Sequence, residues 1–468
     1  MYRYLLLLLV GITLVLGGCT LAPEYTRPAS PVPEDWPRGA AYQETKTASG
    51  VSTASELKWQ EFFTDEKLQK IITTALKNNR DLRLAALNVE RARALYRIQR
   101  AELLPTVNAV GSGSKQRVPA DLSTTGNAMT AEQYSVNLGI ISWEIDFFGR
   151  IRSLKDRALE EYLATDQARR SAQILLVSAV ANTYLSLAAD RENLKLAEST
   201  LETQQAAYNL IRRRCDVGLA SELDLRRAQS QMDIARGDAA RNTRLVAQDE
   251  NALTLLIGSS APSELMPSAL DSVSPPREIS PGKPSETLLL RPDILAAEHR
   301  LKASNANIGA ARAAFFPRIS LTTAIGTASA DLSGLFKSGQ ETWSFAPQIT
   351  MPIFDARTWS AYDATKVERE IALAQYENAI QNAFREVADA LAVRGTVDQQ
   401  IAAQQSLVNA VAETYRLSNA RYTKGIDSYL GVLDAQRSLY GAQQGLISLR
   451  LARFTNRVNL YKVLGGGE

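Results

Sequence analysis

The stretches YNLIRRRCDVGLASELDLRRAQ (residues 208–229) and YRLSNARYTKGIDSYLGVLDAQ (residues 415–436) are two copies of one pattern. A shift of 207 positions places Gly218 on Gly425, and the same register holds for about 100 residues without a gap. Each glycine lies between two long runs of helical sequence, as expected for the turn of a helical hairpin. The chain therefore contains one long helix pair twice, which indicates an internal duplication.

The first helix of the first pair is unusually long. No glycine or proline occurs in residues 151–217, and about 65 residues at ~1.5 Å per residue would span about 100 Å. Helices of globular proteins average only about 11 to 12 residues, so a helix of this length needs a bundle or coiled-coil partner. Residues 219–257 supply that partner, with Gly218 at the turn.

A second shift, of 212 positions, extends the duplication to the segments that precede each helix pair. It places Asp81 on Asp293 and Pro105 on Pro317, so each half has a helix that ends at a proline. Residues that alternate between apolar and polar follow each proline, and a period of two predicts strands. We expect two β-hairpins, with strands at residues 106–114, 134–145, 319–325 and 343–354.

These patterns divide the chain into consecutive segments. We expect a signal peptide at 1–18, a lipid-anchored tether at 19–60, a first repeat at 61–258 with its hairpin at about 104–147, a linker at 259–290, and a second repeat at 291–468 with its hairpin at about 317–354. The tether is rich in Pro, Ala, Ser and Thr, and the linker is rich in proline, as is typical of extended connections.

We expect each of the four strands to have about 10 to 14 residues, which suits the ~9 to 11 that a tilted membrane strand needs. A sheet in hydrocarbon must close, since an open edge leaves backbone groups unpaired. Single-chain membrane barrels begin at about eight strands, so four strands per chain would require an oligomer. Aromatic residues near the strand ends fit interfacial girdles, and they fit the core of a small soluble sheet as well. The pattern favours a membrane α+β protein.

The first residues predict export and lipidation. Arg3 precedes an apolar run at residues 5–16, and Leu16-Gly17-Gly18-Cys19 has the form of a lipobox, whose cysteine is diacylated and becomes the new N-terminus. The run is too short for a transmembrane anchor, which needs roughly 20 residues. Thr20 stands where an aspartate would retain a lipoprotein in the inner membrane. We therefore expect Cys19 to anchor the chain in outer-membrane lipid.

The composition argues against several classes of function. After residue 18 the chain carries 52 basic and 50 acidic residues, since Arg3 is the only charge removed, and this balance argues against a nucleic-acid partner. Cys215 is expected to be a small buried hydrophobe. The single histidine, His299, has no Cys/His cluster and no obvious nucleophile beside it, and no GxxxxGK[ST] pattern occurs. We expect no metal, no cofactor and no enzymatic activity.

Together these features resemble a known family. The lipobox, the duplicated plan and four further segments make the chain similar to the TolC-type outer-membrane factors. Within that family it resembles the OprM-like lipoproteins of resistance-nodulation-division (RND) multidrug pumps. The similarity covers essentially the whole mature chain, and the segments that carry it are residues 78–82, 143–150, 313–317 and 429–439.

The resemblance implies a homotrimer in which three chains form one 12-stranded outer-membrane β-barrel, continuous with a long periplasmic α-helical barrel. It implies a passive exit duct of a tripartite multidrug efflux system, which an inner-membrane RND transporter feeds through a periplasmic adaptor protein. No cofactor is implied. A duct for type I protein secretion and a non-channel helical lipoprotein scaffold are the alternatives, and an envelope hydrolase is a more distant one.

The family closes its duct at the periplasmic helix turns, where the adaptor touches it, and Gly218 and Gly425 mark those turns here. By resemblance, Asp434 is the pore-constricting aspartate and Leu430, one helical turn earlier, is an apolar constriction. Three copies of Asp434 would form an acidic ring, which favours cations. Arg227 stands at the equivalent position of the first repeat, so we expect one ring aspartate per chain.

The resemblance also assigns a latch. Asp224 and Tyr422 match family positions whose hydrogen bonds across helices hold the tip shut. A family arginine of this latch corresponds to Asp427 here, so the latch is expected to use other bases. The candidates are Arg421, Lys424 and Arg226.

Overall fold

The computed structural model describes residues 20–42, 52–54 and 56–466. They divide into two compact units. The sheet unit comprises residues 20–28, 88–165 and 296–376, and the bundle unit comprises the described residues within 29–87, 166–295 and 377–466. The signal peptide and lipidation predictions, for residues 1–18 and Cys19, lie outside the described residues.

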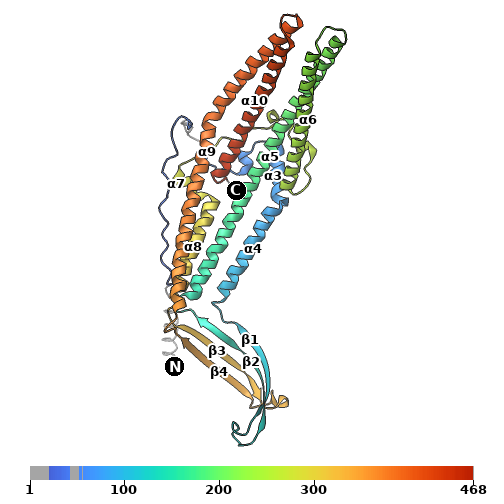
Figure 1. Cartoon of the computed structure of the whole chain (residues 1–468). Coiled ribbons are helices and arrows are strands. Elements are labelled where there is room, and N and C mark those ends of the chain that lie inside the picture. Colours follow the sequence, from blue (N-terminus) through green and yellow to red (C-terminus); the bar gives the residue numbers. More distant parts are fainter. Residues whose placement is uncertain (1–19, 43–51, 55, 467–468) are drawn as a thin grey trace. The chain divides into compact units, whose positions relative to one another are not determined.

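The sheet unit is built on one antiparallel sheet with the strand order β1-β2-β3-β4 (Figure 1). The strands are β1 (Val107–Val118), β2 (Met129–Ile145), β3 (Arg318–Ser329) and β4 (Glu341–Thr350), and η4 (Leu332–Gly334) lies in the second hairpin loop. The expected four strands per chain are confirmed. β4 ends at Thr350, earlier than expected and before Pro352. β1, β2 and β3 extend further, because their pairing continues into segments assigned to loops.

Strand β2 has two local irregularities, a close approach to β3 and a β-bulge. A Cβ at Gly139 would collide with the backbone oxygen of Thr323, so only glycine permits this approach of β2 to β3. The register between the two strands then shifts between Ile140 and Trp143, and Ser142 at this bulge has a φ of 56°. Bulges bend a strand and increase its twist, which suits a sheet that has to curve.

The two outer strands each leave one backbone edge unpaired within the chain. Every residue of β4 is exposed, and the exposed fractions of Trp343, Phe345 and Ile349 are 80%, 63% and 70%. An apolar edge strand of this kind pairs with another strand where one is available. The sheet of one chain is therefore incomplete as a membrane-spanning structure.

Four long helices continue from the sheet. α4 (Arg80–Ala101) leads into β1, α5 (Arg150–Asp216) follows β2, α8 (Pro292–Ala313) leads into β3, and α9 (Ala356–Thr423) follows β4. α4 and α8 each have 22 residues, and both of their ends are 212 positions apart. The duplication thus extends to the bounds of these helices.

Residues 20–28, here called the strap, run along α8 (Figure 1). The backbone oxygen of Leu21 accepts a hydrogen bond from Arg312 at 3.1 Å, and that of Pro23 accepts one from Asn305 at 2.7 Å. This part of the predicted tether is therefore packed on a helix. The reason is that polar side chains of α8 satisfy its carbonyl groups.

A buried carboxylate holds the far end of the strap. The side chain of Glu298 on α8 is only 4% exposed, and Arg27 donates two hydrogen bonds to it at 2.8 and 3.2 Å. Tyr25 donates a third at 3.2 Å, and Lys302 lies 3.1 Å away. A buried charge must be paired in this way to be tolerated, so these contacts fix the register of the strap on α8.

Two long helical hairpins make up most of the bundle unit, and the first residues of their helices α5 and α9 belong to the sheet unit. α5, with 67 residues, is followed by α6 (Glu222–Ile257, 36 residues), and α9, with 68 residues, is followed by α10 (Tyr429–Val463, 35 residues). The predicted repetition of a long helix pair is confirmed. The corresponding helices of the two repeats differ in length by one residue.

The linker at residues 259–290 contains only short elements, which are η1 (Ser263–Leu265), η2 (Leu270–Ser272), α7 (Pro284–Thr287) and η3 (Leu288–Leu290). Arginines of the long helices bind its carbonyl oxygens. Arg191 donates to Pro267 at 2.7 Å, Arg457 to Pro276 at 3.2 Å and Arg394 to Ile279 at 3.2 Å. These bonds replace the secondary structure that a proline-rich segment cannot form.

The hydrophobic core of the bundle unit involves α2 (Trp59–Phe62) and α3 (Glu66–Asn78). Phe62 and Phe63 are fully buried, and the ring of Phe62 stacks on Tyr461 of α10 at 4.1 Å between centroids. The hydroxyl of Tyr461 donates to the backbone oxygen of Leu57 at 3.1 Å. This core therefore joins the N-terminal helices to the last helix of the chain.

Candidate functional site at the helix tips

Two glycines form the turns at the tips of the helical hairpins. Gly218 has a φ of 75° and Gly425 a φ of 73°, which are left-handed conformations that glycine adopts without strain. The nitrogens of Gly218 and Leu219 donate to Cys215 and Arg214, in the pattern that ends a helix with a left-handed residue. The second turn repeats this arrangement.

Each turn is followed at once by a new helix. In the first hairpin the hydroxyl of Ser221 accepts from the nitrogen of Asp224 at 3.1 Å and donates to its carboxylate at 2.6 Å. In the second hairpin Ser428 occupies the same position before α10 and makes no such cap. The start of α10 is therefore held by side-chain packing rather than by a capping bond.

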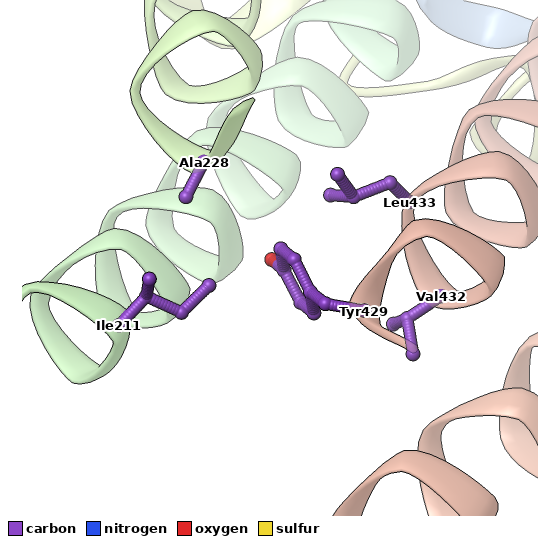
Figure 2. Packing of buried hydrophobic residues seen from close by; sticks show 5 residues of the cluster. All are labelled: Ile211, Ala228, Tyr429, Val432 and Leu433. Carbon is purple, nitrogen blue, oxygen red and sulfur yellow. The ribbon is translucent and has the colours of Figure 1, made fainter. Parts of the chain in front are cut away.

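That packing is a small apolar core shared by the two hairpins (Figure 2). Ile211 of α5 and Ala228 of α6 face Tyr429, Val432 and Leu433 of α10, and all five are buried. Burial raises the pKa of Tyr429 to about 12, so its hydroxyl is neutral at physiological pH. The tips of the two hairpins are thus in direct apolar contact.

A polar contact also joins the two hairpins near their tips. Arg214 of α5 donates to the hydroxyl of Tyr422 of α9 at 3.2 Å, and its guanidinium lies 5.8 Å from the centre of that ring. The Tyr422 ring in turn lies 5.1 Å from that of Tyr429. Arg214 therefore reaches the edge of the apolar core from the neighbouring hairpin.

An ion pair lies within the second hairpin. Arg421 binds both carboxylate oxygens of Asp427 across the turn at Gly425, at 2.6 and 3.2 Å. These hydrogen bonds from the guanidinium lower the pKa of Asp427, so that the pair stays charged well into the acid range. Of the three bases considered for the latch, the structure pairs Arg421 with Asp427.

The remaining gate candidates make only local contacts within the chain. Asp224 binds Ser221 and lies 4.0 Å from Arg227, and it does not meet Tyr422 among the contacts of the described residues. Asp434 lies 3.4 Å from Arg437 with a side chain that is 62% exposed, and Leu430 is 42% exposed. Both side chains are thus presented to solvent at the start of α10.

Cys215 differs from its sequence prediction. It is half-buried rather than buried, and its sulfur lies 4.0 Å from a carboxylate oxygen of Glu222. The reason is its place three residues before the tip glycine, where the helix approaches solvent.

Comparison with known proteins decides the family. Residues 71–259 and 284–466 match the family described as outer membrane efflux protein. The chain belongs to that family. As an outer membrane efflux protein it is a channel component and not an enzyme, and its four strands with two long helix pairs are the fold of these channels.

Its relatives are similar over nearly their whole length. The toluene efflux pump outer membrane protein TtgC of Pseudomonas putida is 52% identical over 464 residues, which are 99% of this chain and 95% of the relative. The antibiotic efflux pump outer membrane protein ArpC of Pseudomonas putida has the same identity and coverage. The MtrE outer membrane channel of Neisseria gonorrhoeae, solved in an open state, has a TM-score of 0.85 at 40% identity, covering 96% of this chain and 98% of that one.

For this efflux protein, sequence reasoning missed Arg214, Tyr429 and Leu433 at the tips. Arg214 could have been found, because it is the repeat equivalent of Arg421, which was a candidate. Tyr429 and Leu433 could not, since an apolar residue at a helix start looks the same in sequence whether it faces a partner hairpin or solvent.

Proposed function

We propose that this protein is the outer-membrane exit channel of an efflux pump that expels antibiotics, organic solvents or related toxic compounds. The observation that carries the proposal is the four-stranded sheet with two open edges, joined directly to long helical hairpins. Membership of the outer membrane efflux protein family supports it, as do relatives named for toluene and antibiotic efflux.

We propose that the channel is a homotrimer. One chain leaves β1 and β4 unpaired, and pairing β4 of each chain with β1 of the next would close the sheet. Three chains would give a 12-stranded barrel, above the minimum of about eight strands known for membrane barrels. The backbone edge of β4 would then be paired, and its exposed apolar side chains Trp343, Phe345 and Ile349 would face lipid.

The partners follow from the resemblance to pump lipoproteins. We propose that a periplasmic adaptor protein contacts the tips at Gly218 and Gly425, and that an inner-membrane RND transporter loads the substrates. Cys19 would carry lipid and add a second membrane attachment, which stable anchoring generally requires. The repeats are proposed to comprise residues 61–258 and 291–468, with 259–290 as a linker in the equatorial region between them.

We propose that the tips are the gate. Asp434 and Leu430 would line the constriction, because both side chains are exposed at the start of α10 beside the buried Leu433. Tyr422 would hold the second hairpin to the first through Arg214, and Asp427 would hold its own turn through Arg421. Asp224 has only local partners within one chain, so its latch role would require a neighbouring chain.

The proposal is tested by single-channel conductance in a planar bilayer. The purified protein is compared with the Asp224→Ala/Tyr422→Phe variant, which removes one carboxylate and one hydroxyl at the tips. We expect small cation-selective steps from the natural protein, because a shut tip with an acidic constriction passes few ions. We expect larger steps from the variant, because the hydroxyl that accepts from Arg214 is gone.

Silence from both proteins, when both are folded and inserted, would overturn the channel proposal in favour of a non-channel lipoprotein scaffold. Steps of equal size would preserve the channel and remove the latch assignment. A duct for type I protein secretion would conduct ions as well. It is distinguished in cells, where deletion would abolish secretion of a protein and leave susceptibility to antibiotics and toluene unchanged.

A further inference from the structure

The two repeats use the same helix face in different ways. On α8, Asn305 and Arg312 bind strap carbonyls. Between them, a Cβ at Gly309 would lie 2.7 Å from the nitrogen of Ala22, so the strap touches the helix backbone there. These three positions form one face of α8, and the chain's own N-terminal segment covers it.

The equivalent face of α4 consists of arginines. The shift of 212 positions places Arg93 on Asn305, Arg97 on Gly309 and Arg100 on Arg312, and α4 and α8 coincide at both ends under the same shift. Residues at spacings of four and three lie one above the other on a helix. All three arginines are exposed. Where the second repeat seats the strap, the first repeat presents three guanidinium groups.

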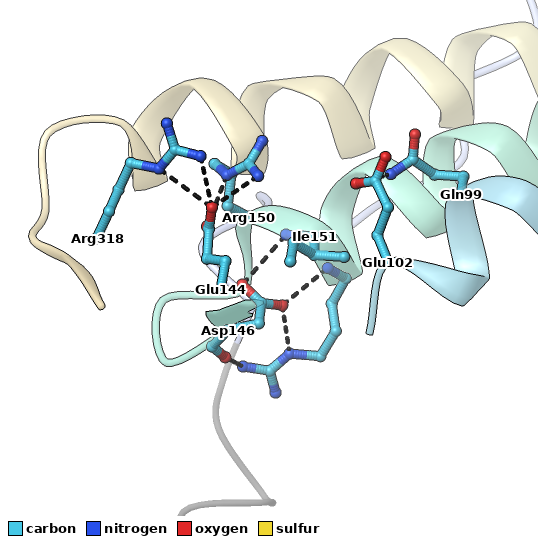
Figure 3. A network of polar contacts seen from close by, with 8 residues as sticks. Gln99, Glu102, Glu144, Asp146, Arg150, Ile151 and Arg318 are labelled. Atoms are coloured by element: carbon cyan, nitrogen blue, oxygen red, sulfur yellow. Dashed lines mark hydrogen bonds and ion pairs between the residues drawn. The ribbon is translucent and has the colours of Figure 1, made fainter. Parts of the chain in front are cut away.

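Among the described residues these guanidinium groups have no acidic partner, whereas arginines at the neighbouring helix end do. Arg150 binds both oxygens of Glu144 at 2.8 and 2.9 Å, and Arg152 binds Asp146 at 3.1 Å (Figure 3). Within the described part of the chain, none of the three α4 arginines forms an ion pair with a carboxylate. Their charge is therefore available to something outside this chain.

The acidic residues of the same segment, Glu90 and Glu102, cancel only part of that charge. Glu102 is engaged with the amide of Gln99 at 2.7 Å (Figure 3), and Glu90 lies one turn before Arg93 on the side away from the sheet. Arg91 adds a further positive charge. The half of α4 next to the sheet thus keeps a positive balance.

Aromatic residues at the end of the sheet indicate how far this face lies from the membrane surface. Phe316 stacks on Phe148 at 4.8 Å between centroids, and aromatic belts mark the level of a membrane–water interface. Leu104 is the repeat equivalent of Phe316, and Arg100 lies one helical turn before it. At ~1.5 Å per residue, Arg93 lies about 10 Å further along the helix.

We propose that the α4 face formed by Arg93, Arg97 and Arg100 binds the phosphate groups of anionic phospholipids in the periplasmic leaflet of the outer membrane. Arginine forms paired hydrogen bonds with phosphate oxygens and keeps its charge. The attraction of a charged leaflet for basic residues extends over about one Debye length, or about 10 Å at 0.1 M salt. At ~1.5 Å per residue, Arg100 and Arg97 lie about 6 and about 10 Å from the level of Leu104, and Arg93 lies about 16 Å from it.

The strap supports lipid as the occupant. It begins one residue after Cys19, so the α8 face that it covers must be reachable from the surface of the membrane. The equivalent face of α4 would be reachable in the same way. Each repeat would then have one attachment to the leaflet. The second repeat attaches through the lipid-linked strap on α8, and the first through the arginine face on α4. The inference rests on the membrane placement of the sheet and the lipidation of Cys19 in the proposed function, and not on the gate.

The test is native mass spectrometry of the detergent-released full-length protein with added phosphatidylglycerol or phosphatidylethanolamine. The Arg93→Gln/Arg97→Gln/Arg100→Gln variant is compared with Arg357→Gln/Lys366→Gln/Arg369→Gln. The control removes three charges at the same end of α9, where each cation has a carboxylate partner. Each basic residue near an anionic surface contributes roughly fivefold to binding. We expect a preference for phosphatidylglycerol that weakens in salt, falls at least about tenfold in the α4 variant and persists in the control.

A lysine version, Arg93→Lys/Arg97→Lys/Arg100→Lys, should keep most of the preference, because the charge remains. Equal lipid binding by the natural protein and the α4 variant would overturn the inference. Dissociation of the α4 variant into monomers would overturn the inference in favour of a contact with a second copy of the chain. If the α4 variant alone no longer sedimented with peptidoglycan sacculi, the arginine face would bind the cell wall instead. Conductance measured on the same preparations separates these results from a failure to insert.

Discussion

Arg214 and Arg421 occupy the same position in the two hairpins, 207 residues apart and four residues before the tip glycine, yet they bind different partners. Arg421 binds Asp427 within its own hairpin, whereas Arg214 crosses to Tyr422 of the other. The cause is local, because Ala220 stands in the first hairpin where Asp427 stands in the second. Without an acidic residue in its own turn, Arg214 is free to join the two repeats.

This relationship predicts that Arg214→Gln loosens the tip. A hydrogen bond contributes about 1 kcal/mol, so its loss should shift the balance between shut and open tips by roughly fivefold per chain. Larger or longer conductance steps in a planar bilayer would show it. Arg213→Gln is the matched control, because Arg213 binds only the backbone oxygen of Asn209 in its own helix. Equal effects of the two substitutions would mean that net charge, and not the contact with Tyr422, controls the tip.

The same reasoning predicts that a new carboxylate in the first hairpin opens the channel, because it competes with Tyr422 for Arg214. Ala220→Asp gives the first hairpin the carboxylate that Asp427 gives the second, and it should draw Arg214 away from Tyr422. We expect this variant to conduct like Arg214→Gln, although it removes no side chain that makes a bond. Ala220→Asn introduces a similar volume without charge and should leave conductance unchanged. If Ala220→Asp conducts like the natural protein, the local explanation is contradicted.

Asp434 is expected to set ion selectivity. Three exposed carboxylates around one axis concentrate cations, so Asp434→Asn should reduce the preference for cations over anions. The measurement is the reversal potential across a potassium chloride gradient, which should move towards zero. Asp233→Asn is the control, since Asp233 forms an ion pair with Arg236 at the spacing of Asp434 and Arg437. A reversal potential that is identical in all three proteins would remove Asp434 from the constriction.

The sequence predicted the architecture well because the duplication tests it twice. A glycine between two helical runs is weak evidence once, but Gly218 and Gly425 agree together with both hairpins and both prolines. The contacts at the tips could not be predicted in the same way, because they depend on which residues of different hairpins meet. Nothing in the pattern indicates that Arg214 reaches Tyr422, or that the strap lies on α8 instead of extending freely.

Glycines in the bundle unit should respond to alanine according to backbone conformation. Gly218→Ala and Gly425→Ala place a Cβ in open space but keep a left-handed φ, which costs about 1 to 2 kcal/mol. Gly237→Ala and Gly441→Ala also place a Cβ in open space, but within regular helix, and should stabilise by about 0.5 to 1 kcal/mol. Thermal unfolding in detergent should therefore shift in opposite directions. A lower unfolding midpoint in all four variants would mean that the helix glycines Gly237 and Gly441 contact something outside the chain.

A pair of aspartates between α5 and α6 predicts a pH dependence of stability. Burial, and then the charge of Asp190, raise the pKa of Asp249 from 3.8 to about 6, and the Oδ2 atom of Asp249 is buried without a hydrogen-bond partner in the described structure. Burial raises the pKa of Asp190 as well, against the opposing effects of a hydrogen bond with Asn193 and the charge of Arg241. The folded protein thus prefers Asp249 in its protonated form more strongly than the unfolded chain does.

Because the folded pKa is the higher one, the contribution of Asp249 to stability is fully present below pH 3.8 and is lost as the pH rises through 6. Asp249→Asn removes the titration and should stabilise the protein at pH 7.5, by about 1 kcal/mol once solvent screening of this partly exposed group is allowed for. At pH 4.5 the gain should nearly vanish. The measurement is the thermal unfolding midpoint of both proteins across this range, with Asp233→Asn as the exposed control. A gain of equal size at every pH would mean that the asparagine adds a contact of its own, and that Asp249 is not the group that titrates.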